Sequence, residues 1–302
     1  MIAGFSGAAG QGLNVMASKV TFALAAIVSL VICGATSCKE PPNKGLQFVG
    51  KGRPEIKRSA PKGLVIVTHG WIEKGRGDWA EDMAKAIAGR VDANDWICGY
   101  FDWSDGAETI NPTDAARFAR DVAGPQLARQ ILKTDRNWRH IHLLGHSCGC
   151  WVVSEAAKIL ARETQADVHL TFFDAYVPAR WDEESLADVN ASAEAEFWAE
   201  QYYTRDLTLK WTQHNLRFAH NVDISAVNGV VKDHNFPWQW YFATVSGKYP
   251  QKAFLHKGRP ICVVGGLEYG FARSREAGGA DSWEKSLRLP TGNEAVELTG
   301  KR

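Results

Sequence analysis

The amino-acid sequence predicts an α/β protein with a mostly parallel central sheet that is covered by helices on both faces. Short, wholly apolar runs alternate along the chain with longer segments whose apolar residues recur at helical spacing. Such runs are typical of strands buried on both faces, and their alternation with helices favours a parallel sheet. The composition agrees, because 45% hydrophobic and 23% charged residues in a chain of 302 describe an ordinary globular protein. A net charge of +1 without any basic run argues against a nucleic-acid partner.

The N-terminal segment has the pattern of an export signal. Residues 20–33 form a continuous apolar run that a lysine precedes and small residues follow. A membrane-spanning helix needs about 20 apolar residues, so this shorter run favours a signal peptide over residues 1–38, with Met16 as an alternative start. Residues 35–38 also resemble a bacterial lipoprotein box. We therefore expect an exported protein, either a lipoprotein attached to a membrane through lipidated Cys38 or a plainly secreted or periplasmic one.

The rest of the chain is predicted to form a tether followed by a single domain. Residues 39–61 are rich in proline, glycine and lysine and are expected to form a tether with one edge strand. No linker, repeat or low-complexity segment divides residues 62–302, which predicts one domain. The four cysteines beyond the signal are too few for a disulfide framework. Cys98 and Cys262 lie in apolar runs that suit small core residues.

The expected helices and strands follow from the hydrophobic periodicity. Strands are predicted along the run that starts at Ile141 and at residues 64–68, 96–101, 168–173, 197–203 and 222–227. Helices are predicted from residue 78 onward, over 113–133, from 149 to about 161 and over 238–245. The first places Trp79, Met83 and Ile87 on one face, and Gly124-Pro125 must kink or split the second. A hairpin is expected at residues 261–264 and 267–272.

The strand that starts at Ile141 ends in Gly145-His146-Ser147-Cys148-Gly149, a Gly-x-Ser-x-Gly pattern followed by a predicted helix. This order is typical of a nucleophile elbow, in which the strand delivers the serine to a tight turn at the edge of the sheet. Glycines allow strand and helix to approach where a Cβ would clash. An ordinary glycine-rich turn is the alternative. The apolar run before the motif and the helical period after it favour Ser147 as a catalytic nucleophile.

Acyl transfer by a serine needs a base, a carboxylate that orients the base and donors for the developing oxyanion. In hydrolases with this elbow the order along the chain is serine, acid, histidine. Asp174 ends the next predicted strand, at the same sheet edge as Ser147, although a helix-capping role is the alternative. Asp223 is the second candidate acid. Residue chemistry alone does not decide between the downstream histidines, which are His214, His220, His234 and His256.

Two further histidines, His140 and His142, alternate along the strand before the elbow and are expected to face one way. Two histidines without a third ligand make a poor metal site. We therefore expect packed or surface residues here, with no metal and no cofactor.

Five segments in order resemble the pancreatic-type lipase family over roughly residues 64–245. His69-Gly70-Trp71 resembles the family's His-Gly-Phe turn, and Asp102-Trp103 resembles its Asp-Trp pair. Gly145-His146-Ser147-Cys148-Gly149 resembles its Gly-His-Ser-Leu-Gly elbow, and Phe173-Asp174-Ala175 with Pro178 resembles its Leu-Asp-Pro-Ala segment. His234 with Tyr241 and Thr244-Val245 resembles the region around its catalytic histidine.

The resemblance implies an α/β-hydrolase fold and a carboxylic-ester hydrolase that acts on lipid or small acyl esters through an acyl-enzyme. It implies Ser147 as nucleophile, His234 as base and Asp174 as the acid that orients it. The backbone N–H groups of Trp71 and Cys148 are the implied oxyanion hole. An amidase or thioesterase on the same fold, and a non-catalytic lipid- or ester-binding relative, are the alternatives.

The chain also departs from the family pattern. Cys148 replaces the usual apolar residue, and the segment between Asp174 and His234 is short and lacks the cysteines that bracket the family's lid. The residues after Val245 are too few for the β-sandwich domain that many members carry, so we expect a member without it. Because residues 182–200 carry seven acidic side chains and no basic one, we expect esterase-like rather than interfacial kinetics.

Overall fold

The computed structural model describes residues 45–50, 63–71, 78–179, 181, 186–189, 196–205, 210–228, 234–249, 270–274 and 292–295. All of them belong to the compact unit Pro42–Arg302. The expected signal peptide, Cys38, Cys262 and most of the expected tether lie outside the described residues. Among the helices that are described, none is both long and apolar enough to cross a membrane.

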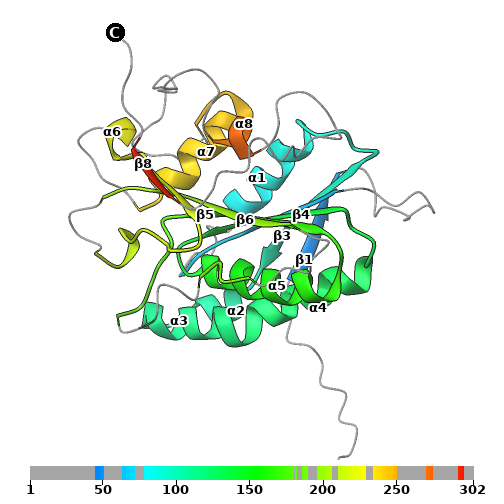
Figure 1. Ribbon diagram of the computed structural model, residues 1–302, viewed down its shortest axis with the longest axis horizontal. Helices are drawn as coiled ribbons and strands as arrows, with labels where there is room; N and C mark the ends of the chain where they lie inside the picture. The colour runs from blue at the N-terminus through cyan, green and yellow to red at the C-terminus, as the bar shows by residue number, and fades with distance from the viewer. Residues whose placement is uncertain are drawn as a thin grey trace, which may run out of the picture. The chain divides into compact units, whose positions relative to one another are not determined.

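A single eight-stranded sheet forms the centre of this unit (Figure 1). Its strands, in chain order, are β1 Gly45–Val49, β2 Gly63–Thr68, β3 Trp96–Asp102, β4 His140–His146, β5 Asp167–Phe173, β6 Phe197–Tyr203, β7 His220–Asp223 and β8 Gly292–Ala295. Their order across the sheet is β1-β3-β2-β4-β5-β6-β7-β8. Edge strand β1 runs antiparallel to β3, and all other neighbours are parallel. The predicted mostly parallel sheet is confirmed, and the sheet starts at Gly45, before the boundary expected at residue 62.

Helices cover both faces of the sheet, as expected (Figure 1). One face carries α1 Asp78–Ala88, α7 Phe236–Ser246 and α8 Phe271–Ser274, and the other carries α2 Ser104–Ala107, α3 Pro112–Phe118, α4 Gly124–Thr134 and α5 Gly149–Glu163. Strand β2 shows why its sequence is apolar throughout. Leu64 and Ile66 pack into the core beneath α3, α4 and α5, whereas Val65 and Val67 pack into the core beneath α1 and α7. Successive side chains point to opposite faces, so a central strand needs apolar residues at every position.

The predicted long helix over residues 113–133 is divided as expected. Between α3 and α4 lies one π-helical turn, η1, over Ala119–Ala123. Pro125 cannot donate to the helical ladder, and a wider turn accommodates it. A Cβ on Gly124 would lie 2.8 Å from the carbonyl oxygen of Val152 in α5. Glycine therefore lets α4 pack closely against the helix that follows the elbow.

Two predicted strands are wrong in part. Beyond Asp223 the chain leaves the sheet and forms α6 Ser225–Asn228, because the Ser225 N–H donates to the Asp223 carboxylate at 2.9 Å and starts a turn. The expected second hairpin strand is also contradicted, since Phe271 begins the short helix α8. Gly270 takes φ +69°, and the Phe271 N–H donates to Thr244 Oγ1 at 3.0 Å. The expected first strand of that hairpin lies outside the described residues.

Candidate active site

Ser147 lies in the turn between β4 and α5, with φ +54°. A non-glycine residue seldom adopts this left-handed conformation, which stores strain and recurs at functional turns. Hydrogen bonds hold the turn in place: the Ser147 N–H donates to the carbonyl oxygen of Phe173 at 3.0 Å, and its own carbonyl accepts from Cys150 N–H at 3.1 Å. The strand, turn and helix thus have the geometry of a nucleophile elbow.

The two glycines of the elbow permit close backbone contacts. A Cβ on Gly149 would lie only 2.2 Å from the carbonyl oxygen of His69, and one on Gly145 would lie 2.7 Å from the carbonyl oxygen of Gly149. Neither contact is with a flexible side chain, so relief would require the end of β2 or the start of α5 to move. This explains the Gly-x-Ser-x-Gly pattern in physical terms.

We expect Gly149→Ala to lower the free energy of unfolding by about 1–3 kcal/mol, since the added methyl group overpacks a backbone contact. Urea denaturation monitored by circular dichroism measures the change. Gly89→Ala is the matched control, because a Cβ there would make only an ordinary contact, 3.4 Å from the carbonyl oxygen of Ala86. Equal stability of the two variants would contradict the packing argument.

Asp174 follows β5 directly and is fully buried, with φ +43°. Its Oδ2 accepts from His234 Nδ1 at 3.1 Å, and its Oδ1 accepts from the Thr204 N–H at 2.7 Å. Burial raises the pKa of Asp174 above its usual value, and the hydrogen bond from His234 opposes this shift. With Nδ1 donating to the carboxylate, His234 presents Nε2 as a proton acceptor.

His234 lies beside the elbow as well as against Asp174. The ring of His146, the residue before Ser147, lies 4.6 Å from the His234 ring, and His146 Nε2 donates to the His234 carbonyl oxygen at 3.1 Å. The structure therefore brings Ser147, His234 and Asp174 to the carboxyl edge of β4 and β5. The contact between His146 and His234 was not predicted from the sequence. His146 was considered only as a candidate base, and its position before Ser147 excluded it from that role.

The alternative acid has another partner, and the alternative bases that are described lie in β7 or just before it. Asp223 accepts from Arg205 Nε at 2.7 Å and caps Ser225. His220 is the first residue of β7, and the carbonyl oxygen of His214 accepts from the Gln201 side chain at 2.8 Å. His256 lies outside the described residues. Of the carboxylates and histidines weighed from sequence, the structure pairs Asp174 with His234.

Both residues predicted to supply the oxyanion donors lie next to the turn at Ser147. Trp71 follows Gly70, where an added Cβ would lie 2.9 Å from the Cβ of Ser147, so the backbone before Trp71 packs closely against the nucleophile turn. The Trp71 ring is fixed because its Nε1–H donates to the carbonyl oxygen of Thr109 at 2.9 Å. Cys148 is the N-cap residue of α5, and its buried thiol points to the carbonyl oxygen of Pro112 at 3.4 Å. The replacement at Cys148 therefore leaves its backbone donor in place.

His69 and Trp103 hold the strand end that carries Trp71. The Trp103 Nε1–H donates to the His69 carbonyl oxygen at 2.8 Å, and the two rings stack at 5.5 Å. His69 Nδ1 donates to the Gly70 carbonyl oxygen at 2.9 Å, so Nε2 accepts from the Trp103 N–H at 3.2 Å. The His-Gly and Asp-Trp segments are thus one hydrogen-bonded unit.

The family model named Lipase matches residues 44–197, slightly more than half of the chain. The chain belongs to the lipase family.

Relatives of this lipase-family chain match it over a shorter stretch. Over 97 residues it is 36% identical to the pancreatic triacylglycerol lipase of Mus musculus and 38% identical to the inactive pancreatic lipase-related protein 1 of the same species. Over 99 residues it is 37% identical to the pancreatic lipase-related protein 2 of Rattus norvegicus. These stretches cover 31–32% of this chain and 20% of each relative. The match thus spans about a fifth of the relatives' length.

Solved structures resemble this lipase-family chain more distantly. Esterase PE8 aligns at 15% identity with a TM-score of 0.35, over 52% of this chain and 75% of its own. XC6422 of Xanthomonas campestris, described as an α/β serine hydrolase without lid, aligns at 20% identity with a TM-score of 0.30. The alignment covers 52% of this chain and 63% of XC6422. The assignment to the α/β-hydrolase fold follows from the sheet topology and the lipase family.

A second group of polar side chains lies within the sheet, where His140 and His142 are both buried, which is one of the two arrangements expected for them. His142 was set aside because no third ligand was visible in the sequence. In the structure His169 and Glu200, from the next two strands, bring their side-chain donor atoms within 4.8 Å of one another and of His142. The alternation of His169 and Thr171 on β5 was a signal, but only the strand register reveals the group.

Proposed function

We propose that this protein is an exported serine carboxylic-ester hydrolase of lipase or esterase type, with Ser147 as nucleophile, His234 as base and Asp174 as the orienting acid. The observation that carries the proposal is the hydrogen bond of 3.1 Å from His234 Nδ1 to the buried Asp174 carboxylate, beside a serine at φ +54°. Membership of the lipase family supports the reaction class. Export rests on the apolar run at residues 20–33.

The proposed reaction proceeds through an acyl-enzyme. Ser147 Oγ attacks the ester carbonyl carbon while His234 Nε2 takes its proton, and the Asp174 carboxylate stabilises the imidazolium. The backbone N–H groups of Trp71 and Cys148 donate to the oxyanion that develops. The alcohol leaves with the proton from His234. Water, deprotonated by His234, then attacks the acyl carbon, the bond to Ser147 Oγ breaks as Oγ takes the proton back from His234, and the carboxylic acid is released.

The proposed substrates are short-chain acyl esters. Interfacial activation needs an apolar cover over the site, whereas the candidate cover is acidic and is expected to avoid lipid surfaces. Of the residues 182–200 weighed as that cover, 197–200 lie instead in β6 of the central sheet, with Glu200 buried, and 182–185 and 190–195 lie outside the described residues. The test is the hydrolysis rate against tributyrin concentration. We expect saturation below the solubility limit, and a sharp rise as droplets form would show an interfacial lipase instead.

A panel of p-nitrophenyl esters, matched amides and thioesters tests the reaction class. We expect turnover to be highest with esters of short chain length. Preference for an amide or thioester would favour the alternative hydrolases on this fold. Absence of turnover and of labelling by a fluorophosphonate in the folded protein would favour a non-catalytic binder. One relative, pancreatic lipase-related protein 1 of Mus musculus, is named inactive.

His146 is expected to position the base. In His146→Phe the ring that packs on His234 remains, but the donor to the His234 carbonyl oxygen is lost. A neutral hydrogen bond contributes about 0.5–1.5 kcal/mol, so we expect kcat to fall up to about 10-fold with KM little changed. His214→Phe, at a histidine away from the elbow, is the control. An unchanged kcat in His146→Phe would contradict the positioning role.

A further inference from the structure

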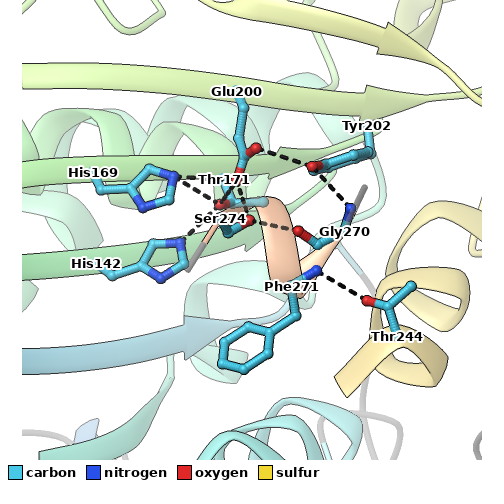
Figure 2. A network of polar contacts seen from close by, with 9 residues as sticks. All are labelled: His142, His169, Thr171, Glu200, Tyr202, Thr244, Gly270, Phe271 and Ser274. Carbon is cyan, nitrogen blue, oxygen red and sulfur yellow. Dashed lines mark hydrogen bonds and ion pairs between the residues drawn. The ribbon is translucent and has the colours of Figure 1, made fainter. Parts of the chain in front are cut away.

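Five polar side chains form a buried cluster on the sheet face that α7 and α8 cover (Figure 2). This buried polar cluster consists of His142, His169, Thr171, Glu200 and Ser274. Its members come from β4, β5, β6 and α8, and all are buried. His142 precedes Ser147 by five positions on β4, so the cluster lies within the sheet and not at its catalytic edge. The proposed hydrolytic mechanism uses none of these side chains.

Nitrogen and oxygen atoms converge at the centre of the buried polar cluster. Thr171 Oγ1 donates to Glu200 Oε1 at 2.8 Å and lies 2.8 Å from His142 Nε2 and 3.4 Å from His169 Nε2. His169 Nε2 lies 3.1 Å from Glu200 Oε1, and Ser274 Oγ donates to the same carboxylate oxygen. The imidazole rings of His142 and His169 stack at 3.8 Å. Two imidazoles, one carboxylate and two hydroxyls therefore surround one point.

The sheet register builds this convergence. His142 and His169 are direct Cα partners in the β4–β5 ladder, and Thr171 and Glu200 are direct partners in the β5–β6 ladder. Ligands on central strands of a parallel sheet are held more precisely than ligands on loops. Because β4 and β5 also carry Ser147 and Asp174 at their ends, whatever joins these strands supports the candidate active site.

Tyr241 provides an independent observation. It is fully buried in α7, and its hydroxyl has no hydrogen-bond partner within bonding geometry among the described residues. Burial and the charge of Glu200 raise the pKa of Tyr241, and the nearby Ser274 and Thr171 hydroxyls oppose this rise, so the hydroxyl lies next to the cluster. A buried hydroxyl without a partner costs about 1–3 kcal/mol, and such groups commonly mark a bound water or ion. A water molecule on an ion at the centre of the cluster would be the partner of Tyr241.

We propose that the buried polar cluster binds one zinc ion through His142, His169 and Glu200, with an oxygen from Thr171, Ser274 or water as the fourth ligand. Two imidazoles and a carboxylate form a donor set typical of zinc, whereas calcium and magnesium prefer all-oxygen sites. The role of the ion is structural, because its three protein ligands come from three neighbouring strands within the buried core. Tyr241 and Tyr202, whose hydroxyl donates to Glu200 Oε2 at 3.0 Å, form the surrounding shell.

Zinc requires a modest rearrangement of the cluster. Zinc–nitrogen and zinc–oxygen distances of about 2.0–2.2 Å place tetrahedral ligand atoms about 3.3 Å apart. The three donor atoms already lie within 4.8 Å of one another. The two parallel rings must tilt so that both lone pairs meet the ion, and rotation about the soft χ2 of histidine provides this motion.

Metal analysis of the full chain tests the proposal. The protein is purified without a polyhistidine tag from cells grown with added zinc, dialysed against a weak chelator and analysed by inductively coupled plasma mass spectrometry. We expect about one zinc per chain in the wild type and, because each ligand is needed for tight binding, less than about a tenth of that in His169→Gln and Glu200→Gln. The matched control is His140→Gln, on the same face of β4, whose ring lies 6.3 Å from that of His169. It should retain the zinc.

A second pair of measurements covers the case in which ligand variants fail to fold. Tyr241→Phe removes only the hydroxyl, and chelator competition should show zinc affinity lower by about 10–100-fold, as for other outer-shell groups. Metal-free wild type titrated with Co²⁺ should develop the visible absorption of a tetrahedral site. Wild-type protein that holds no stoichiometric zinc and takes up no cobalt would overturn the proposal, as would equal zinc loss in His140→Gln. These readouts do not involve hydrolysis, so their outcome is independent of the proposed activity.

Discussion

Ser147→Ala is expected to lower kcat/KM for p-nitrophenyl butyrate by at least about 10⁴-fold while the protein remains folded. The substitution removes the oxygen that forms the acyl-enzyme and leaves the strained turn occupied by another residue with a Cβ. Little stability should be lost, because the substitution keeps the backbone hydrogen bonds of Ser147 that hold the turn. Initial rates give the loss of activity, and circular dichroism verifies the fold.

The matched control is Ser154→Ala, two turns further along α5. Its hydroxyl accepts from the Ala187 N–H at 3.1 Å and is buried, so its loss should cost about 1 kcal/mol of stability and little activity. Equal activity of Ser147→Ala and Ser154→Ala would remove Ser147 from the mechanism.

His234→Ala and Asp174→Asn should each lower kcat by about 10⁴-fold. The first change removes the base. The second keeps the shape of the acid but removes the charge that accepts from His234 Nδ1 and stabilises the imidazolium. Because Asp174 is fully buried and also accepts from Thr204, the asparagine should remain in place and perturb orientation and tautomer rather than packing. Steady-state rates with a saturating short-chain ester measure both effects.

Asp223→Asn and His220→Ala are the controls for this pair. Asp223 pairs with an exposed arginine side chain, and such a pair contributes at most about 1 kcal/mol to stability. We expect activity near that of wild type in both controls. A greater loss in Asp223→Asn than in Asp174→Asn, or in His220→Ala than in His234→Ala, would move the acid or the base to β7.

Local sequence patterns predict most of the sheet because central strands bury every side chain. Strand β2 is apolar at nearly every position, the elbow strand β4 is apolar apart from three histidines, and the structure buries all of their residues. The split at Gly124-Pro125 was likewise predictable from the missing proline N–H. The resemblance selected His234, which composition and spacing did not separate from the other downstream histidines.

Contacts that depend on strand register could not be predicted from local pattern. His142 meets His169 only because β4 and β5 pair in one particular register, and a shift by one residue would turn the two side chains to opposite faces. The C-terminal end predicted for strand β7 was wrong for a different reason. Asp223 accepts from Ser225 N–H, and this side-chain cap ends an apolar run that would otherwise suit a strand.

Labelling with a fluorophosphonate, followed by intact-mass measurement and peptide mapping, tests most directly the claim that Ser147 is the activated nucleophile. We expect one adduct per folded wild-type chain, located on Ser147. The adduct should be absent in Ser147→Ala and should form orders of magnitude more slowly in His234→Ala, because the serine loses its base. Folded wild-type protein that stays unlabelled, or that carries the adduct on another serine, would contradict the account.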